Sequence, residues 1–180
     1  MKKVFIVHGF QGSPSGGWRP WLMAELEKHN IYACALPMPK PEAPVVSEWV
    51  NEIARVVDMN HNDEICLVGH SLGVPAILRY LEGDVSIRIS KVVLVSGPSE
   101  KNGNPKIENF LETPFDFKTI KNKVDEFYII HGVNDPVVPF VNAETFAREL
   151  GGELIPIENG GHLNGSSGWR QLPQALEVLI

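Results

Sequence analysis

The sequence predicts an α/β fold built on a mostly parallel sheet. Short apolar runs rich in β-branched and aromatic residues alternate with segments of helical apolar spacing along the whole chain. No linker, internal repeat or low-complexity stretch interrupts this series. Right-handed crossovers then place helices on both faces of the sheet. We therefore expect a three-layer α/β/α sandwich that forms one domain over residues 1–180.

Each expected element has its own signal. The strands are short β-prone apolar runs, at 3–7, 31–36, 65–69, 91–96, 125–131 and 153–157. The helices carry apolar stripes, at 18–29, 47–59, 72–82, 140–150 and 169–180. Ser47 is a candidate helix cap, Pro75 is tolerated in the first turn of its helix, and Pro173 starts or kinks the last helix. Residues 97–123 are the least regular part.

Composition narrows the class of protein. The chain has 180 residues, of which 43% are hydrophobic and 21% charged, and its net charge of −6 gives no sign of nucleic-acid or anionic-membrane binding. No apolar run is long enough to span a bilayer, and the first residues lack the features of a signal peptide. Cys34 and Cys66 fall in expected strands, which favours reduced thiols and a cytoplasmic location. We expect a monomer or weak homodimer with a small-molecule partner.

One strand–turn–helix segment carries the strongest chemical signal. Gly69-His70-Ser71-Leu72-Gly73 fits the G-x-S-x-G pattern of a nucleophile elbow. Glycines on either side leave room for a strained turn that lifts the serine hydroxyl clear of the sheet edge. The alternative is a glycine-rich turn with an incidental serine, so the other catalytic groups decide between the two.

An activated serine needs a base and an acid that orients it. We assign His162 as the base, because it follows the last strand behind two glycines. Asp135, after the fifth strand, is the expected orienting acid. Glu100 is the second candidate for this role, and Glu158 is a weaker one. The order Ser71, Asp135, His162 is that of α/β-type serine hydrolases. The remaining histidines are expected at strand ends, in the elbow or on the surface: His8, His29, His61, His70 and His131.

Backbone amides are expected to hold the oxyanion of the reacting carbonyl. One donor is Leu72, the residue after the nucleophile, and the other is Phe10 in the loop after the first strand, with Gln11 as an alternative. Gln11, Trp18 and Met38 are candidate substrate-pocket residues, together with the segment 98–123. The competing interpretation of the aromatic residues is that they belong to the core. We expect no metal and no organic cofactor.

These motifs give the chain a resemblance to the α/β-hydrolase superfamily. Within it, the chain resembles the small serine hydrolases of the retinoblastoma-binding-protein-nine and YdeN type, through His8-Gly9-Phe10, the Ser71 elbow, Asp135 and Gly-Gly-His162. The resemblance covers nearly the whole chain. It implies a minimal fold without a large lid and a six-stranded sheet of order 2-1-3-4-5-6, with the first strand beside the elbow strand. Neither cysteine lies in the L-x-C-x-E sequence of a retinoblastoma-binding motif, so that partner is not carried over.

The sequence thus predicts a carboxylesterase-like serine hydrolase that acts on a small ester, thioester, amide or short peptide-like substrate. Ser71 would form the acyl-enzyme, His162 would move the proton and Asp135 would orient His162. Two alternatives remain open. One is a binding or regulatory protein with a vestigial site, and the other is an acyltransferase that uses the same triad.

Overall fold

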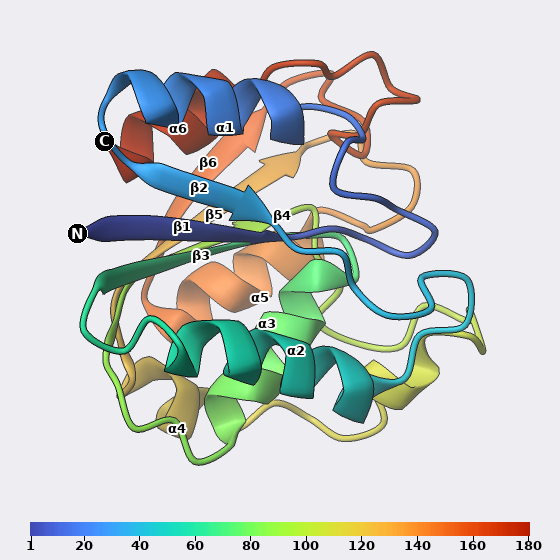
Figure 1. Cartoon of the computed structure of the whole chain (residues 1–180). Helices are drawn as coiled ribbons and strands as arrows, with labels where there is room; N and C mark the ends of the chain where they lie inside the picture. The colour runs from blue at the N-terminus through green and yellow to red at the C-terminus, as the bar shows by residue number, and fades with distance from the viewer.

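The computed structural model describes residues 1–180 and contains one sheet of six strands, all parallel. The strands are β1 (Lys2–Val7), β2 (Tyr32–Ala35), β3 (Glu64–His70), β4 (Ile89–Val95), β5 (Val124–Gly132) and β6 (Glu153–Ile157). Their order across the sheet is β2-β1-β3-β4-β5-β6. This confirms the predicted fold class and strand order (Figure 1).

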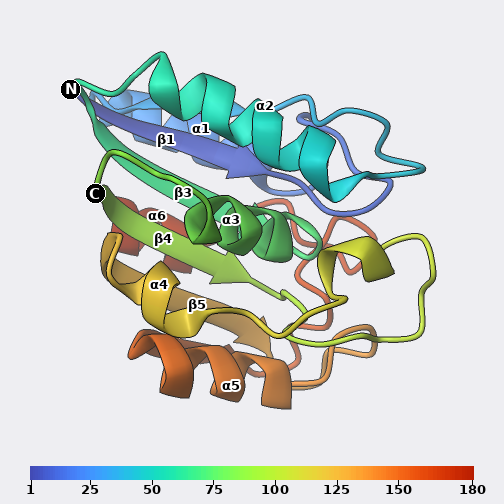
Figure 2. The ribbon, with the colours of Figure 1, turned by 90° about the horizontal axis from the view of Figure 1, so that it is seen from below.

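Helices cover both faces of this sheet and complete the three layers (Figure 1). They are α1 (Arg19–Lys28), α2 (Val46–Asp58), α3 (Gly73–Glu82), α4 (Phe117–Lys121), α5 (Val141–Leu150) and α6 (Pro173–Leu179). Helices α1 and α6 bury a cluster of 17 residues against one face. Helices α2 to α5 bury a larger cluster of 31 residues against the other face (Figure 2). Alternate residues of β1 enter the two clusters, as the two-residue period of a strand requires.

The strand register brings the loops of the candidate site to one edge. Val7 at the end of β1 pairs with Gly69 of β3, and Val95 at the end of β4 pairs with His70. Gly132 at the end of β5 pairs with Ile157, which ends β6. The carboxyl ends of the strands therefore lie level, and the loops that follow them meet there, opposite both chain termini (Figure 1).

Three local expectations need correction. Ser47 does not cap α2, because the helix already starts at Val46 and no side chain caps it. The last helix does not extend over 169–180: it starts at Pro173, one of the two roles expected of that residue, and residues 169–172 lie outside it. The irregular segment contains the unexpected α4, a five-residue helix capped by Asp116, whose carboxylate accepts from the Thr119 amide at 3.0 Å.

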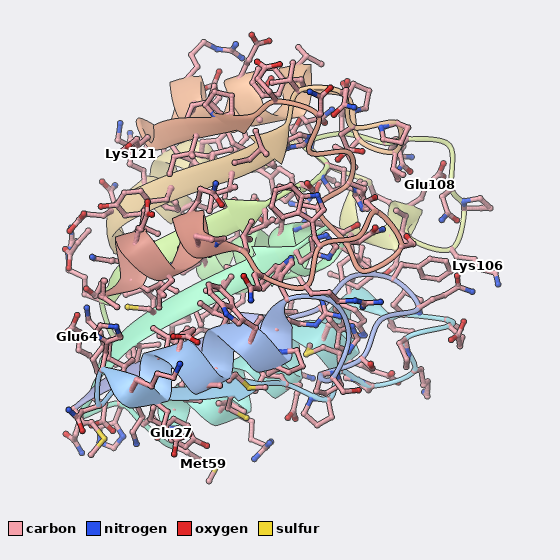
Figure 3. All side chains as sticks on the ribbon, turned by 90° about the horizontal axis from the view of Figure 1, so that it is seen from above. Glu27, Met59, Glu64, Lys106, Glu108 and Lys121 are labelled. Carbon is pink, nitrogen blue, oxygen red and sulfur yellow. The ribbon has the colours of Figure 1, made fainter.

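The segment 98–123 lies beside the loop that follows β1. Its 3-10 turn, Glu108–Phe110, is followed by α4, and Asn109 binds the start of α2 through the Val46 amide at 2.7 Å. Lys106 and Glu108 project at the edge that carries the strand-end loops (Figure 3). The Lys106 ammonium is 5.9 Å from the centre of the Phe10 ring. The segment thus flanks the loop that contains Phe10.

Two further observations concern the chain as a whole. Cys34 is half-buried and Cys66 buried, and both thiols are free. None of the helices combines the length and the hydrophobicity that crossing a bilayer requires.

Packing beneath α5 gives a test of the larger core. Phe146 is 1% exposed and its ring lies 6.3 Å from those of Phe115 and Phe117. We expect F146A to lower the free energy of unfolding by about 3–5 kcal/mol, because the cavity left behind refills poorly. The matched control on the same helix is V141A, at a side chain 54% exposed, which should change it by less than about 0.5 kcal/mol. Urea titration measures the free energy of unfolding of both variants. Equal losses in F146A and V141A would contradict the conclusion that Phe146 packs in the larger core.

Candidate active site

The turn between β3 and α3 holds Ser71 in a left-handed conformation, with φ +53°. A Cβ at Gly73 would lie 2.2 Å from the Val7 carbonyl oxygen, and one at Gly69 would lie 2.8 Å from the Gly73 backbone. Only glycine fits at these two positions, as the elbow pattern requires. The Ser71 amide donates to the Val95 carbonyl at 2.9 Å, which fixes the turn to the neighbouring strand.

The structure brings the three predicted triad residues together. His162 Nε2 lies 3.0 Å from Ser71 Oγ, and His162 Nδ1 lies 2.8 Å from Asp135 Oδ2. Asp135 is 8% exposed and His162 is 6% exposed, whereas Ser71 is half-exposed toward the solvent. Glu100 and Glu158, the weaker candidates for the acid, are exposed, and neither bonds to His162. The histidine can therefore accept the serine proton while the aspartate holds its other nitrogen.

Asp135 is kept ionised by its hydrogen bonds. Burial raises the pKa of Asp135, but the bonds from His162 and from the Val138 and Val137 amides outweigh it, so the pKa is lower than usual. These amides lie 3.0 and 2.8 Å from Oδ1. His131 Nε2 donates to the Val138 carbonyl at 2.9 Å. The side chain of His131 thus steadies the loop that presents the carboxylate.

The loop that carries His162 is fixed by side chains from distant parts of the chain and by Trp169 of the loop itself. Three ring N–H groups donate to its carbonyl oxygens: His70 to His162 at 3.0 Å, Trp18 to Leu163 at 2.8 Å and Trp169 to Gly160 at 2.7 Å. The Gly161 amide donates to Asn134 Oδ1 at 2.9 Å. The sequence analysis did not predict these hydrogen bonds to the loop of His162. It could have indicated the two from tryptophans, because a buried tryptophan needs an acceptor for its ring N–H group.

The two predicted oxyanion donors are free. The amides of Phe10 and Leu72 donate no hydrogen bond within the protein. The Gln11 amide, the alternative donor, is already bound to the Pro41 carbonyl at 3.0 Å. The loop of Phe10 also lies against the nucleophile, because β1 and β3 are neighbours. Phe10 and Leu72 are thus the amides available to stabilise negative charge next to Ser71.

The other histidines have structural or surface positions. His29 and His61 are exposed, and His8 donates through Nδ1 to the Gly9 carbonyl at 2.8 Å. His70 is 5% exposed. Burial, with a smaller effect of the nearby His162, lowers the pKa of His70 to about 3. His70 is therefore neutral at physiological pH and carries the proton on Nε2, where the His162 carbonyl accepts it.

The cavity above Ser71 is small and polar. It has a volume of about 370 Å³, and Phe10 is the one hydrophobic residue among the 15 that line it. Gln11 lines this cavity, as expected, but Trp18 and Met38 do not: they are 0% and 4% exposed and belong to the two cores. No residue of the segment 98–123 lines it. The core interpretation of Trp18 and Met38 is therefore the correct one.

No group of three or more histidine, cysteine, aspartate or glutamate side chains is placed to hold a metal ion. The chemistry available at this edge of the sheet is that of the serine, the imidazole, the carboxylate and the free amides.

A parallel sheet of this strand order, with a strained serine turn after its third strand, defines the α/β-hydrolase class of proteins. The chain belongs to the serine hydrolase family, whose model matches residues 4–180. It is 31% identical to the YdeN protein of Bacillus subtilis (strain 168) over 180 residues, which covers 99% of this chain and 94% of that protein. It is 24% identical to the serine hydrolase RBBP9 of Rattus norvegicus, in a match that covers 91% of this chain and 88% of that protein.

Solved structures agree with this membership. The crystal structure of the ydeN gene product from B. subtilis has a TM-score of 0.94 at 30% identity, and the match covers 99% of this chain and 97% of that one. Est1E from Butyrivibrio proteoclasticus, with ferulic acid bound, has a TM-score of 0.79 at 16% identity, covering 99% and 86%. The second likeness concerns the fold alone.

The buried His70 makes stability depend on pH. Its folded pKa of about 3 lies below the ordinary 6.5, so unfolding takes up a proton between these values. The contribution of His70 to the free energy of unfolding is therefore fully present above about pH 6.5 and is lost as the pH drops toward 3. Well inside this range, we expect that contribution to decrease by about 1.4 kcal/mol for each pH unit.

The variant H70Q keeps an amide donor near Nε2 but cannot titrate. Urea unfolding at pH 7.5 and pH 5 should show that the free energy of unfolding decreases less for H70Q than for the unmodified protein. Some decrease at pH 5 should persist in both proteins, because burial also lowers the pKa of His8 and His131. Identical pH slopes for the two proteins would show that His70 is not held neutral by the fold.

Proposed function

We propose that this protein cleaves small esters, or related thioesters and amides, through an acyl-enzyme on Ser71. The observation that carries the proposal is the continuous series of hydrogen bonds from Ser71 through His162 to Asp135, at 3.0 and 2.8 Å. A surface serine has no such base within reach, and its hydroxyl is a poor nucleophile at neutral pH.

The geometry supports a two-step reaction. His162 Nε2 accepts the proton of Ser71 Oγ as that oxygen attacks the substrate carbonyl, while Asp135 stabilises the resulting imidazolium. The free amides of Phe10 and Leu72 then donate to the oxyanion. Collapse of the tetrahedral intermediate breaks the bond to the leaving group, which receives the proton from Nε2. Water repeats the sequence on the acyl-enzyme, releasing the acid and restoring Ser71.

The form of the site favours small substrates. A cavity of about 370 Å³ lies at the low end of the range usual for small-molecule sites. Its polar lining suits a substrate with several hydrogen-bonding groups better than a long acyl chain. The names of the matched family and of RBBP9 are consistent with hydrolysis.

A fluorophosphonate probe tests the nucleophile directly. We expect the probe to label the purified protein at Ser71, located by mass spectrometry, and S71A to remain folded but unlabelled. Hydrolysis of 4-nitrophenyl acetate should fall by at least about 10⁴-fold in S71A and in H162A, because the triad acts as a unit. The matched control is S15A, at an exposed serine of the loop after β1 that does not line the cavity.

Two outcomes would contradict the proposal. Absence of labelling in the folded protein would leave a binding or regulatory role. Labelling at Ser71 combined with acyl transfer to an added alcohol, much faster than to water, would identify an acyltransferase.

A further inference from the structure

Arg19 is a buried cation without an anionic partner in the protein. It is 6% exposed, at the first residue of α1, and its Nε donates to the Ser13 carbonyl at 2.9 Å. Neither Nη atom donates a hydrogen bond within the protein, and no carboxylate forms an ion pair with the guanidinium. Burial lowers the pKa of Arg19 to about 10, so the side chain stays charged at neutral pH. Most of the side chain is buried, while the two Nη atoms have no partner in the protein and remain accessible to solvent.

This cation faces the same cavity as the nucleophile. Arg19 and Arg170 line it together with Ser71 and His162, and none of the 15 lining residues is an aspartate or a glutamate. Arg170 is exposed and likewise has no partner within the protein. The whole chain has a net charge of −6. Positive charge is therefore concentrated at the one cavity where substrate would meet Ser71, on an otherwise acidic protein.

We propose that this cavity selects substrates that carry a free carboxylate in addition to the scissile bond, and that Arg19 binds this carboxylate. The inference rests on the hydrolase function proposed above and specifies its substrate class. The planar guanidinium presents its two free Nη groups as a fork that matches the two oxygens of a carboxylate. A bound carboxylate would supply the counter-charge that the fold itself leaves out. Arg170, at the rim, adds attraction without a fixed geometry.

The carboxylate can belong to the acyl half or to the leaving group, and paired esters separate the two cases. The first pair is mono-4-nitrophenyl adipate and its methyl ester, in which the acyl chain is charged or neutral. The second pair is 4-acetoxybenzoate and methyl 4-acetoxybenzoate, in which the leaving group is charged or neutral. For each pair the measured quantity is the ratio of kcat/KM for the charged ester to that for the neutral ester.

We expect the unmodified protein to prefer the charged ester in at least one pair, and R19Q to lower that ratio by about 10- to 100-fold, as the loss of a charge-assisted hydrogen bond predicts. The control is R148Q, which removes the same charge from an exposed residue of α5 paired with Glu149. R148Q should leave the ratio unchanged. A preference for the neutral ester in both pairs, or the same ratio in R19Q as in the unmodified protein, would overturn the inference.

A binding measurement separates this inference from the proposed chemistry. In the S71A background, calorimetry with mono-4-nitrophenyl adipate and with 4-acetoxybenzoate reports recognition without turnover. We expect R19Q to weaken binding of at least one of these esters by 10-fold or more, with thermal melting showing that both variants are folded. That result supports the inference even if the unmodified protein hydrolyses no ester, whereas equal affinities in S71A and S71A/R19Q overturn it.

Discussion

The strained turn at Ser71 is the constraint on which the rest of the site depends. A non-glycine residue at φ +53° costs about 1–3 kcal/mol, and such strain persists only where the surroundings enforce it. Here β1 and β4 enforce it from either side: the Val7 carbonyl leaves no room for a side chain at Gly73, and the Val95 carbonyl binds the Ser71 amide. The strand order therefore does more than define the fold, because it holds the nucleophile above the sheet edge.

The same turn also positions the base. His70 and Ser71 are consecutive, and the side chains of both contact His162. Ser71 Oγ is hydrogen-bonded to the His162 ring, and His70 Nε2 donates to the His162 backbone carbonyl. Trp18 and Trp169 bind neighbouring carbonyl oxygens of that loop. The contacts of His70 and Trp18 join residues 92 and 145 positions apart, whereas Trp169 lies nine positions from Gly160. The distance between nucleophile and base is thus set by packed rings on several elements rather than by the loop alone.

The sequence was sufficient for the fold class, the strands and the meeting of Ser71, Asp135 and His162, because each rests on a local pattern: an apolar run, an elbow, or a polar residue just after a strand. It was insufficient where the answer depends on what surrounds a residue. Trp18 has the size of a pocket residue and the periodicity of a helix start, and only the structure shows its ring in the core with the N–H group on the Leu163 carbonyl. Arg19 has no motif at all, since its significance lies in the absence of a nearby carboxylate.

The cavity that results is unlike a pocket lined by Trp18 and Met38, the candidates that the sequence offered. With Phe10 as its one hydrophobic residue, it offers little apolar area, so burial of a hydrocarbon chain contributes little to binding. Discrimination between substrates then depends on polar contacts, which reject a poorly matched group because the cavity's own donors are left unpaired. Arg170 is exposed and its attraction is screened by salt, whereas Arg19 is only 6% exposed and its attraction is screened less. A selectivity that persists at high ionic strength therefore points to Arg19 as its source.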